Sequence, residues 1–414
     1  MASLKYWLWL TTRKGMGHKA AHQVLAHFGS PERAFFADSA EYERIPELSA
    51  QGRRSLCQKE MEEADHILGN CDRLGIRILT WQDADYPERL RHIYDPPLVL
   101  YWKGRTIPFD EEVTIGMVGT RNCTPYGVRM AGRLSFGLAR SGAVVISGIA
   151  QGIDTACIRG ALKGGGAVAS ILGGGIDVRY PACNRGLYED VAAVGALISE
   201  YPPGTEPLGG HFPVRNRIIS GLSLGIVVVE SPLKGGAMLT ADHALEQDRE
   251  VFAVPGPADS AASAGCNQLI GEGAAKLTET VWDILEEYVD RYPNKITNPR
   301  ALSPEQETQR LEPPEPDAEN ILEEAQEVPR QKEVDKSQGM EYIDWKDQRD
   351  KLTDDQRDIL LVLEDKSLLM DDIIEHTQIP ARRSLSAMTL LQVQGYVTEE
   401  PGKRFRAQVR LKME

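Results

Sequence analysis

The feature that most constrains the fold is a repeated order of apolar run, glycine turn and helical stretch between Val113 and about Val289. The apolar runs read TIGMVG, AVVISG, AVASILGGG, ALISEY, GIVVVE and EVFAVPG. Helical stretches such as Tyr126 to Arg140 and Leu239 to Gln247 lie between them. Continuous apolar strands joined by helical crossovers form parallel sheets that are covered on both faces. The pattern therefore predicts an α/β domain with a mainly parallel sheet, whose ligands bind at the carboxyl ends of the strands.

Three further regions flank this domain. Residues 1–75 predict a small all-α domain of short helices, and a connector over 76–112 leads into the sheet, so that the sheet domain spans 76–290. The turn Gly15-Met16-Gly17 is similar to a helix-hairpin-helix turn that holds phosphate, although a packing or protein-contact role is favoured. Residues 291–350 are rich in proline and acidic residues and predict a disordered linker. Residues 351–414 predict three helices and a basic hairpin, which is typical of a winged helix.

Composition excludes several classes of protein. No run of about 18 apolar residues occurs, so no membrane span is expected. The six cysteines are scattered without a Cys-x-x-Cys pair, and neither they nor the histidines show metal-ligand spacing. This favours reduced thiols in a cytoplasmic protein without a metal site. The net charge of −14 disfavours a polyanionic partner, but 15 acidic and 7 basic residues between Ile296 and Asp350 carry much of it. The local distribution of charge, rather than the net charge, must therefore indicate whether the protein binds a polyanion.

The segment FPVRNRIISG carries the most distinctive charges, Arg215-Asn216-Arg217. Guanidinium groups bind phosphate oxygens in a planar, bidentate way, and a helix start adds amides suited to anions. The alternative is an arginine pair tied to acidic residues inside the sheet domain. Glycine turns end almost every strand, and their amides can form anion sites. Together with Arg121, they favour phosphate binding at one sheet edge.

No catalytic constellation stands out. Ser147 lacks the flanks of a nucleophile elbow, and Asp154, Asp177 and Glu230 are isolated candidate carboxylates. Asp154 is also explained as a helix cap and Asp177 as a turn residue. A non-enzymatic protein is expected, with hydrolysis as the lesser alternative.

Basic residues gather in the expected third helix and hairpin of the tail. A recognition helix followed by a basic wing suits a duplex backbone. The rest of that region is acidic, so a protein-contact or dimerisation role stays open. The candidate duplex contacts are Arg382, Arg383, Lys403, Arg404 and Arg406.

Seven segments between Tyr86 and Ala274 follow one another in an order that resembles the DNA-processing protein A (DprA/Smf) family. They read YPERL, DPPLVLYWKG, VGTR, SGIAQGIDTACIRGAL, LGGGIDVRYPACNRGLY, FPVRNRIISGLS and VFAVPGPADSAASAGCNQLIGEGA. The resemblance implies an extended Rossmann-like domain that binds single-stranded DNA and forms a homodimer. It also implies contact with the RecA recombinase, which the protein would load onto incoming strands that it protects during natural transformation. No cofactor and no catalytic turnover are implied.

The resemblance also implies a DNA pocket, and one addition rests on spacing. Tyr188 lies one helical turn beyond Arg185 and is a candidate for base stacking. Two departures from the family pattern are Cys157, where histidine is usual, and Gly235-Gly236-Ala237-Met238, where Ser-Gly-Ser-Leu is usual. The residues implied to contact DNA are Gly119, Thr120, Arg121, Ser147, Gly148, Asn184, Arg185, Arg215, Asn216 and Arg217.

The sequence thus predicts a cytoplasmic, single-stranded DNA-binding recombination mediator, and two alternatives remain. One is a transcription regulator whose winged helix reads duplex DNA while the sheet domain senses a nucleotide. The other is a nucleotide N-glycosidic hydrolase, because Gly235-Gly236 through Thr240 is weakly similar to such enzymes and Glu230 is a possible carboxylate.

Overall fold

The computed structural model describes residues 2–297, 341–344 and 352–412, apart from 365, 378, 380, 394 and 401–403. The chain divides into two compact units, Met1–Pro316 and Asp317–Glu414. Two stretches of the predicted linker 291–350 belong to folded structure. Lys295 pairs with Glu112 of the sheet domain at 2.6 Å, and Glu341–Asp344 forms strand β10. The prediction of a disordered linker does not hold for these stretches, and its remaining residues lie outside the described ones.

A nine-stranded sheet forms the centre of the first unit, in the order β1-β2-β6-β5-β4-β3-β7-β8-β9. The seven strands from β3 to β9 pair in parallel, whereas β1 and β2 join one edge antiparallel. This confirms the predicted α/β fold with a mainly parallel sheet. The strands are β1 Arg77–Thr80, β2 Val99–Gly104, β3 Thr114–Gly119, β4 Val144–Ser147, β5 Val168–Leu172, β6 Ala196–Ser199, β7 Gly225–Glu230, β8 Glu250–Ala253 and β9 Lys276–Leu277.

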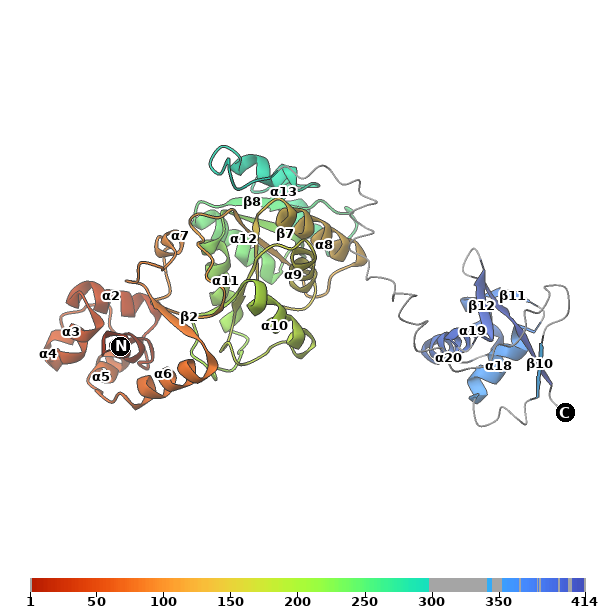
Figure 1. Ribbon diagram of the computed structural model, residues 1–414, viewed down its shortest axis with the longest axis horizontal. Coiled ribbons are helices and arrows are strands. Elements are labelled where there is room, and N and C mark those ends of the chain that lie inside the picture. Colours follow the sequence, from red (N-terminus) through yellow and green to blue (C-terminus); the bar gives the residue numbers. More distant parts are fainter. Residues whose placement is uncertain are drawn as a thin grey trace, which may run out of the picture. The chain divides into compact units, whose positions relative to one another are not determined.

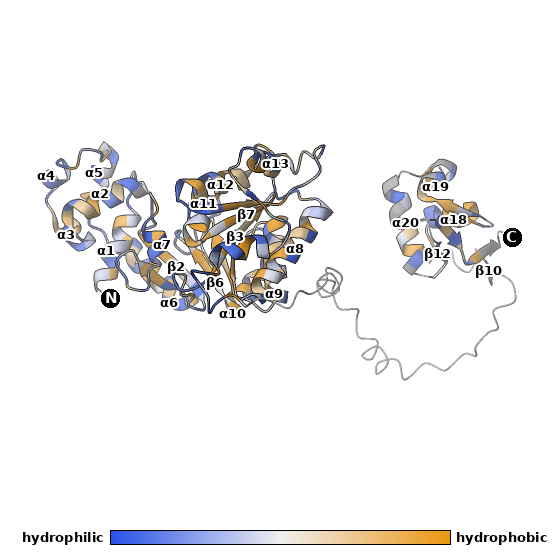
Figure 2. Cartoon of the chain, turned by 90° about the horizontal axis from the view of Figure 1, so that it is seen from above, coloured by the Kyte–Doolittle hydropathy of each residue, from blue (hydrophilic) through white to orange (hydrophobic). Residues whose placement is uncertain are grey.

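Helices cover both faces of this sheet (Figure 1). On one face, α8 (Pro125–Arg140), α9 (Ile153–Lys163) and α10 (Arg185–Val194) share a core with the alternate residues of the strands. The helices on the other face are α7 (Glu88–Arg91), α11 (His211–Leu222), α12 (Gly236–Glu246) and α13 (Ala264–Gly271). Strands buried on both sides must be apolar throughout, and the central strands β3 and β7 are predominantly hydrophobic (Figure 2).

Residues 2–74 form six short helices, as predicted, with Trp7, Leu8, Trp9 and Leu10 in their core. This core continues into β2 through Val99 and Tyr101, so the helices and the sheet share one hydrophobic cluster. A short helical segment, α14 (Trp282–Leu285), and the 3-10 turn Glu286–Tyr288 follow the last strand of the sheet. The amino-terminal helices are α1 Ala2–Thr11, α2 His18–Phe28, α3 Pro31–Phe36, α4 Ser39–Tyr42, α5 Ala50–Leu56 and α6 Glu62–Leu74.

The second unit has the three helices and hairpin expected of a winged helix. Thr353 and Gln356 form a reciprocal capping box at the start of the first helix, which satisfies amides that the helix leaves unpaired. Strands β11, β13 and β12 form a small antiparallel sheet, and β10 pairs with β14. The elements are α18 Asp354–Val362, β11 Ser367–Leu369, α19 Met370–Thr377, α20 Ala381–Val393, β12 Val397–Glu400, β13 Arg404–Ala407 and β14 Val409–Lys412.

Candidate functional site

A cavity of about 550 Å³ lies at the carboxyl ends of β3 and β7. The chain runs from β3 through β4 and β5 to β6 on one side, then returns to β7 on the other side of β3. The loops after β3 and β7 therefore diverge, which makes this edge the topological switch point where ligands of open α/β sheets bind. The lining includes the loop after β3, the start of α11 and the turn before α12, through Gly119, Thr120, Arg121, Phe212, Arg215, Asn216, Lys234, Gly235 and Gly236.

Positive charge and helix starts face this cavity. The first residues of α11 and α12 line it, and the amides of Gly236 and Ala237 at the start of α12 favour anions. The exposed Arg121 guanidinium lies 5.2 Å from the centre of the Phe212 ring. Within the described part of the chain, Arg121 has no carboxylate partner at salt-bridge distance. Its charge is therefore available to an anionic ligand, while the ring contact restrains its position.

Arg215 forms the buried floor of the same cavity. The residue is only 4% exposed, and its guanidinium donates to the carbonyls of Gly148 (3.1 Å) and Ile171 and lies 5.9 Å from the Phe212 ring centre. Burial lowers the pKa of Arg215, and the nearby Asp154 carboxylate opposes that shift. A Cβ atom at position 148 would stand 2.4 Å from the guanidinium, so glycine permits this approach. Phe212 thus contacts both arginines that face the cavity.

Asp154 is a buried acid whose carboxylate acts on the Arg215 charge. Its carboxylate accepts hydrogen bonds from the Gly148 amide (3.1 Å) and the Ala150 amide (3.3 Å). Burial raises the pKa of Asp154 to about 6, against the opposing effects of Arg215 and these amides. Near neutral pH, the carboxylate therefore offsets part of the Arg215 charge at the cavity floor.

The turn between β4 and α9 is strained, and two side chains hold it. Ile149 has φ 57°, which is unusual for a β-branched residue and is found at functional sites. The Asn184 amide donates to the carbonyls of Ile149 (2.9 Å) and Ala150 (3.2 Å). Gly152 has φ 85° and brings the start of α9 against the loop after β3. Asn184 was predicted to contact DNA, but here it positions the turn that carries Ala150 into the cavity.

Five of the predicted contact residues line the cavity, and the others do not line it. Lining the cavity are Gly119, Thr120, Arg121, Arg215 and Asn216. Ser147 is buried and donates to the Met117 carbonyl at 2.8 Å, and the Gly148 amide is already bonded to Asp154. Ser147 and Gly148 therefore support the site from the side of the core and do not line the cavity.

The exposed aromatic side chain near the cavity is Tyr180 and not Tyr188, which the sequence suggested for base stacking. Tyr188 is buried, and its hydroxyl donates to the Tyr180 carbonyl at 2.7 Å. Its ring is not exposed for base stacking. Tyr180 instead lines the cavity, is 44% exposed and lies 5.7 Å from Phe212 between ring centres. Arg185 is exposed at the start of α10.

Arg217 faces away from the cavity. It is buried, forms a bidentate pair with Glu200 at 2.8 and 3.2 Å, and lies 3.5 Å from Asp95. The Glu200 carboxylate raises the pKa of Arg217, although burial, the largest effect, acts in the opposite direction. Arg217 is thus paired with acidic residues inside the domain, which is the alternative to phosphate binding that the sequence left open.

Three residues without a predicted role also line the cavity: Phe212, Lys234 and Tyr180. Phe212 precedes Arg215 by three residues on a helix, a spacing that places two side chains on one face. That spacing was the available signal for Phe212. Lys234 and Tyr180 lie in loops, where no periodic pattern marks them.

The candidate catalytic carboxylates are mostly engaged elsewhere. Glu230 is buried and accepts hydrogen bonds from the Thr124 amide (2.8 Å) and hydroxyl (2.7 Å). Thr124 is the residue that caps the start of α8. Asp177 accepts from the Gly204 amide at 2.8 Å. Among the described residues, no group of three or more His, Cys, Asp or Glu side chains is placed to hold a metal ion. Likewise, none of the described helices has the length and apolar character needed to span a membrane.

The two departures from the family pattern have different surroundings. Cys157 is fully buried in the core beneath α9, where burial raises its pKa well above the ordinary value. Gly235, Gly236 and Ala237 line the cavity at the start of α12. Only the second departure therefore changes the surface of the site.

Basic residues of the second unit are partly neutralised. Arg383 forms a bidentate pair with Asp355 at 2.7 and 2.9 Å, and Arg406 pairs with Glu400 at 3.4 Å. Arg404 donates to the Ser367 carbonyl at 2.8 Å. Lys403 and the side chain of Arg382 lie outside the described residues.

Comparison with known proteins agrees with this architecture. The family model described as DNA recombination-mediator protein A matches residues 77–289. A model of the DprA winged helix domain matches residues 346–403. The chain belongs to the DNA recombination-mediator protein A family. The resemblance seen in the sequence is thereby confirmed for both regions.

Relatives of this family include the DNA processing protein DprA of Bacillus subtilis, which is 42% identical over 248 residues covering 59% of this chain and 82% of the relative. Protein Smf of Synechocystis is 37% identical over 277 residues, which cover 65% of this chain and 69% of that protein. The crystal structure of DNA processing protein A from Streptococcus pneumoniae superimposes with a TM-score of 0.60 at 31% identity. That match covers 68% of this chain and 97% of the other.

Proposed function

We propose that this protein is a single-stranded DNA-binding recombination mediator whose strand site is the cavity at the β3/β7 switch point. The main observation behind this proposal is that Arg121 and Arg215 both contact the Phe212 ring in that cavity. Guanidinium groups bind phosphate oxygens, and aromatic rings stack on bases of any sequence. The names of the Bacillus and Streptococcus relatives, DNA processing proteins, support DNA as the ligand.

The size of the cavity favours a single strand. A volume of about 550 Å³ is in the range of small-molecule sites, so it admits individual nucleotides rather than a duplex. Phe212 and the exposed Tyr180 ring offer stacking surfaces that bases present only when they are not stacked in a duplex. Phosphates on Arg121 and near the start of α12 then account for sequence-independent binding.

Membership of the family supports a proposal for the wider role. We propose that the protein acts in the cytoplasm during natural transformation, protects incoming strands and delivers RecA onto them. A homodimer formed through the sheet domain would place two cavities on one strand and raise affinity without new contacts. No cofactor and no catalytic turnover are part of this proposal.

Two assays on the full chain test this role. The protein should protect a single strand from nuclease digestion and speed RecA filament growth on a strand already coated by a single-strand-binding protein. Arg121→Ala should lose both effects. The control Arg140→Ala removes one exposed charge at the far end of α8 and should retain both. Normal protection and RecA loading by Arg121→Ala would contradict the proposed site.

A further inference from the structure

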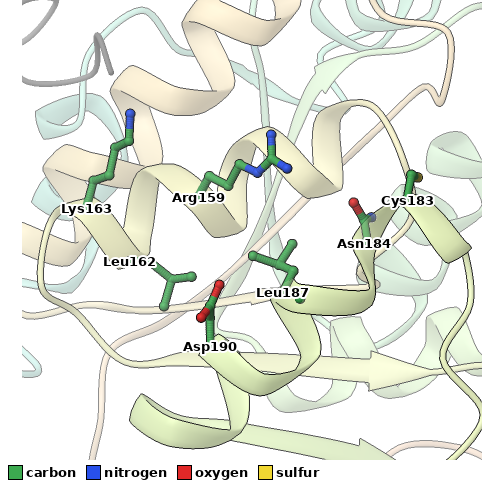
Figure 3. A pocket seen from close by; sticks show the side chains of 8 residues that line it. Arg159, Leu162, Lys163, Cys183, Asn184, Leu187 and Asp190 are labelled. Atoms are coloured by element: carbon green, nitrogen blue, oxygen red, sulfur yellow. The ribbon is translucent and has the colours of Figure 1, made fainter. Parts of the chain in front are cut away.

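A second hollow, of about 370 Å³, lies between α9 and α10. Figure 3 shows Leu162 of α9 and Leu187 of α10 within it, with Arg159 above them and Asp190 beside Leu162. Cys183 and Asn184 line it at the start of α10. We call this hollow the α9/α10 groove. It has an apolar floor and a charged rim, a combination suited to a ligand with both a flat apolar part and a charge.

The cation on this rim is available for binding. Arg159 is exposed, and within the described part of the chain it makes no hydrogen bond or ion pair. Lys163 follows it by one helical turn and also lines the groove. Gly186 lies at the start of α10, where a Cβ atom would meet nothing within 4 Å. The backbone there is open to a ligand, and Asp190 is the single acid that lines the groove.

A hydrogen bond connects the lining of the groove to the lining of the main cavity. Asn184 lines the groove and donates to the carbonyl of Ala150, which lines the cavity. The segment from Tyr180 to Arg185 therefore joins the two hollows. It offers the exposed Tyr180 ring at the cavity side and ends at the exposed Arg185, whose chain neighbours Asn184 and Gly186 line the groove. A chain of nucleotides leaving the cavity meets an aromatic surface and then positive charge.

We propose that the α9/α10 groove is a second subsite for the same DNA strand. The strand crosses the Tyr180–Arg185 segment, places a base over Leu162 and Leu187, and sets its phosphates against Arg159. This inference rests on the proposed function, because it extends the strand site beyond the switch-point cavity. Asp190 opposes the phosphates, so the groove holds the strand less tightly than the cavity does.

Strand length provides the test. Fluorescence anisotropy of the full chain is measured with oligothymidine of about 4 and about 16 nucleotides, a range that spans known single-strand site sizes. Arg159→Ala should weaken binding of the longer strand about three- to tenfold and leave the shorter one unchanged. The salt slope for the longer strand should become shallower by about 0.7, the value of one phosphate contact. Asp190→Asn should strengthen binding of the longer strand.

Controls separate this inference from the proposed function. Arg44→Ala removes the same charge from an exposed position between α4 and α5 and should affect neither strand. If Arg121→Ala weakens both strands while Arg159→Ala and Asp190→Asn change neither, the groove is not on the strand path and the cavity remains. If the unchanged protein binds neither strand, the proposed function and the groove both fail. Equal weakening of both strands by Arg159→Ala would also overturn the groove, since it would indicate a general charge effect.

Discussion

Replacing Arg217 should destabilise the protein without removing a DNA contact. The side chains of Arg217 and Glu200 are 7% and 1% exposed, and they share two hydrogen bonds. Arg217→Met leaves the Glu200 carboxylate buried without its guanidinium partner. Breaking a buried pair in this way costs about 3–5 kcal/mol of unfolding free energy. With roughly 2–4 °C for each kcal/mol, the unfolding midpoint of the first unit should fall by about 6–20 °C.

Circular dichroism against temperature measures this change. The double variant Arg217→Met with Glu200→Gln should recover much of the loss, because it removes both charges rather than one. Below its unfolding transition, Arg217→Met should bind a single strand with an unchanged salt slope, since Arg217 does not line the cavity. The reasoning is refuted if Arg217→Met melts normally but binds with a slope shallower by about 0.7, because Arg217 would then be a phosphate contact.

Three further predictions concern the cavity. Gly148→Ala should lower the free energy of unfolding by about 1–3 kcal/mol in chemical denaturation, because its Cβ displaces Arg215. The control Gly69→Ala, whose Cβ meets open space, should not lower it, and equal effects of the two variants would contradict this prediction. Phe212→Leu should weaken strand binding by about 1–3 kcal/mol in a titration and Phe212→Tyr much less, and similar losses would exclude ring stacking. The pKa of Asp154 is raised to about 6, so lowering the pH through that value should protonate the carboxylate. The Arg215 charge is then no longer offset, and strand binding should become stronger. If the pH profile of the wild-type protein matched that of Asp154→Asn, this prediction would be refuted.

Much of the fold could be predicted because its signals are local. Most residues of the central strands are buried and apolar, so the strands from β3 to β8 were visible in the sequence. The place of the site followed from the same pattern, because parallel strands bring their carboxyl ends to one edge. Gly119, Thr120 and Arg121 reach the cavity for this reason.

The roles of the two arginines of α11 needed the structure. Arg215 and Arg217 are two residues apart on a helix, and such side chains do not share a face. One therefore turns to the cavity, and the other turns to Glu200, which follows β6 in a separate part of the chain. Helical spacing alone indicated that they differ, but only the tertiary contacts show which one meets an acid.

Tyr188 illustrates a second limit. Its spacing from Arg185 is one helical turn, which placed it on the same side of α10 as a predicted contact. The hydroxyl instead meets the Tyr180 carbonyl at 2.7 Å and the ring joins the core. Periodicity gives the face of a helix, but it does not say whether a loop covers that face.

Single-strand binding by the cavity is tested most directly by fluorescence anisotropy of the full chain with labelled oligothymidine and with duplex of equal length, at several salt concentrations. We predict a clear preference for the single strand. We also predict that Arg121→Ala weakens that binding and makes its salt slope shallower by about 0.7. Equal or stronger binding of the duplex that survives Arg121→Ala would contradict the account and move DNA recognition to the winged helix.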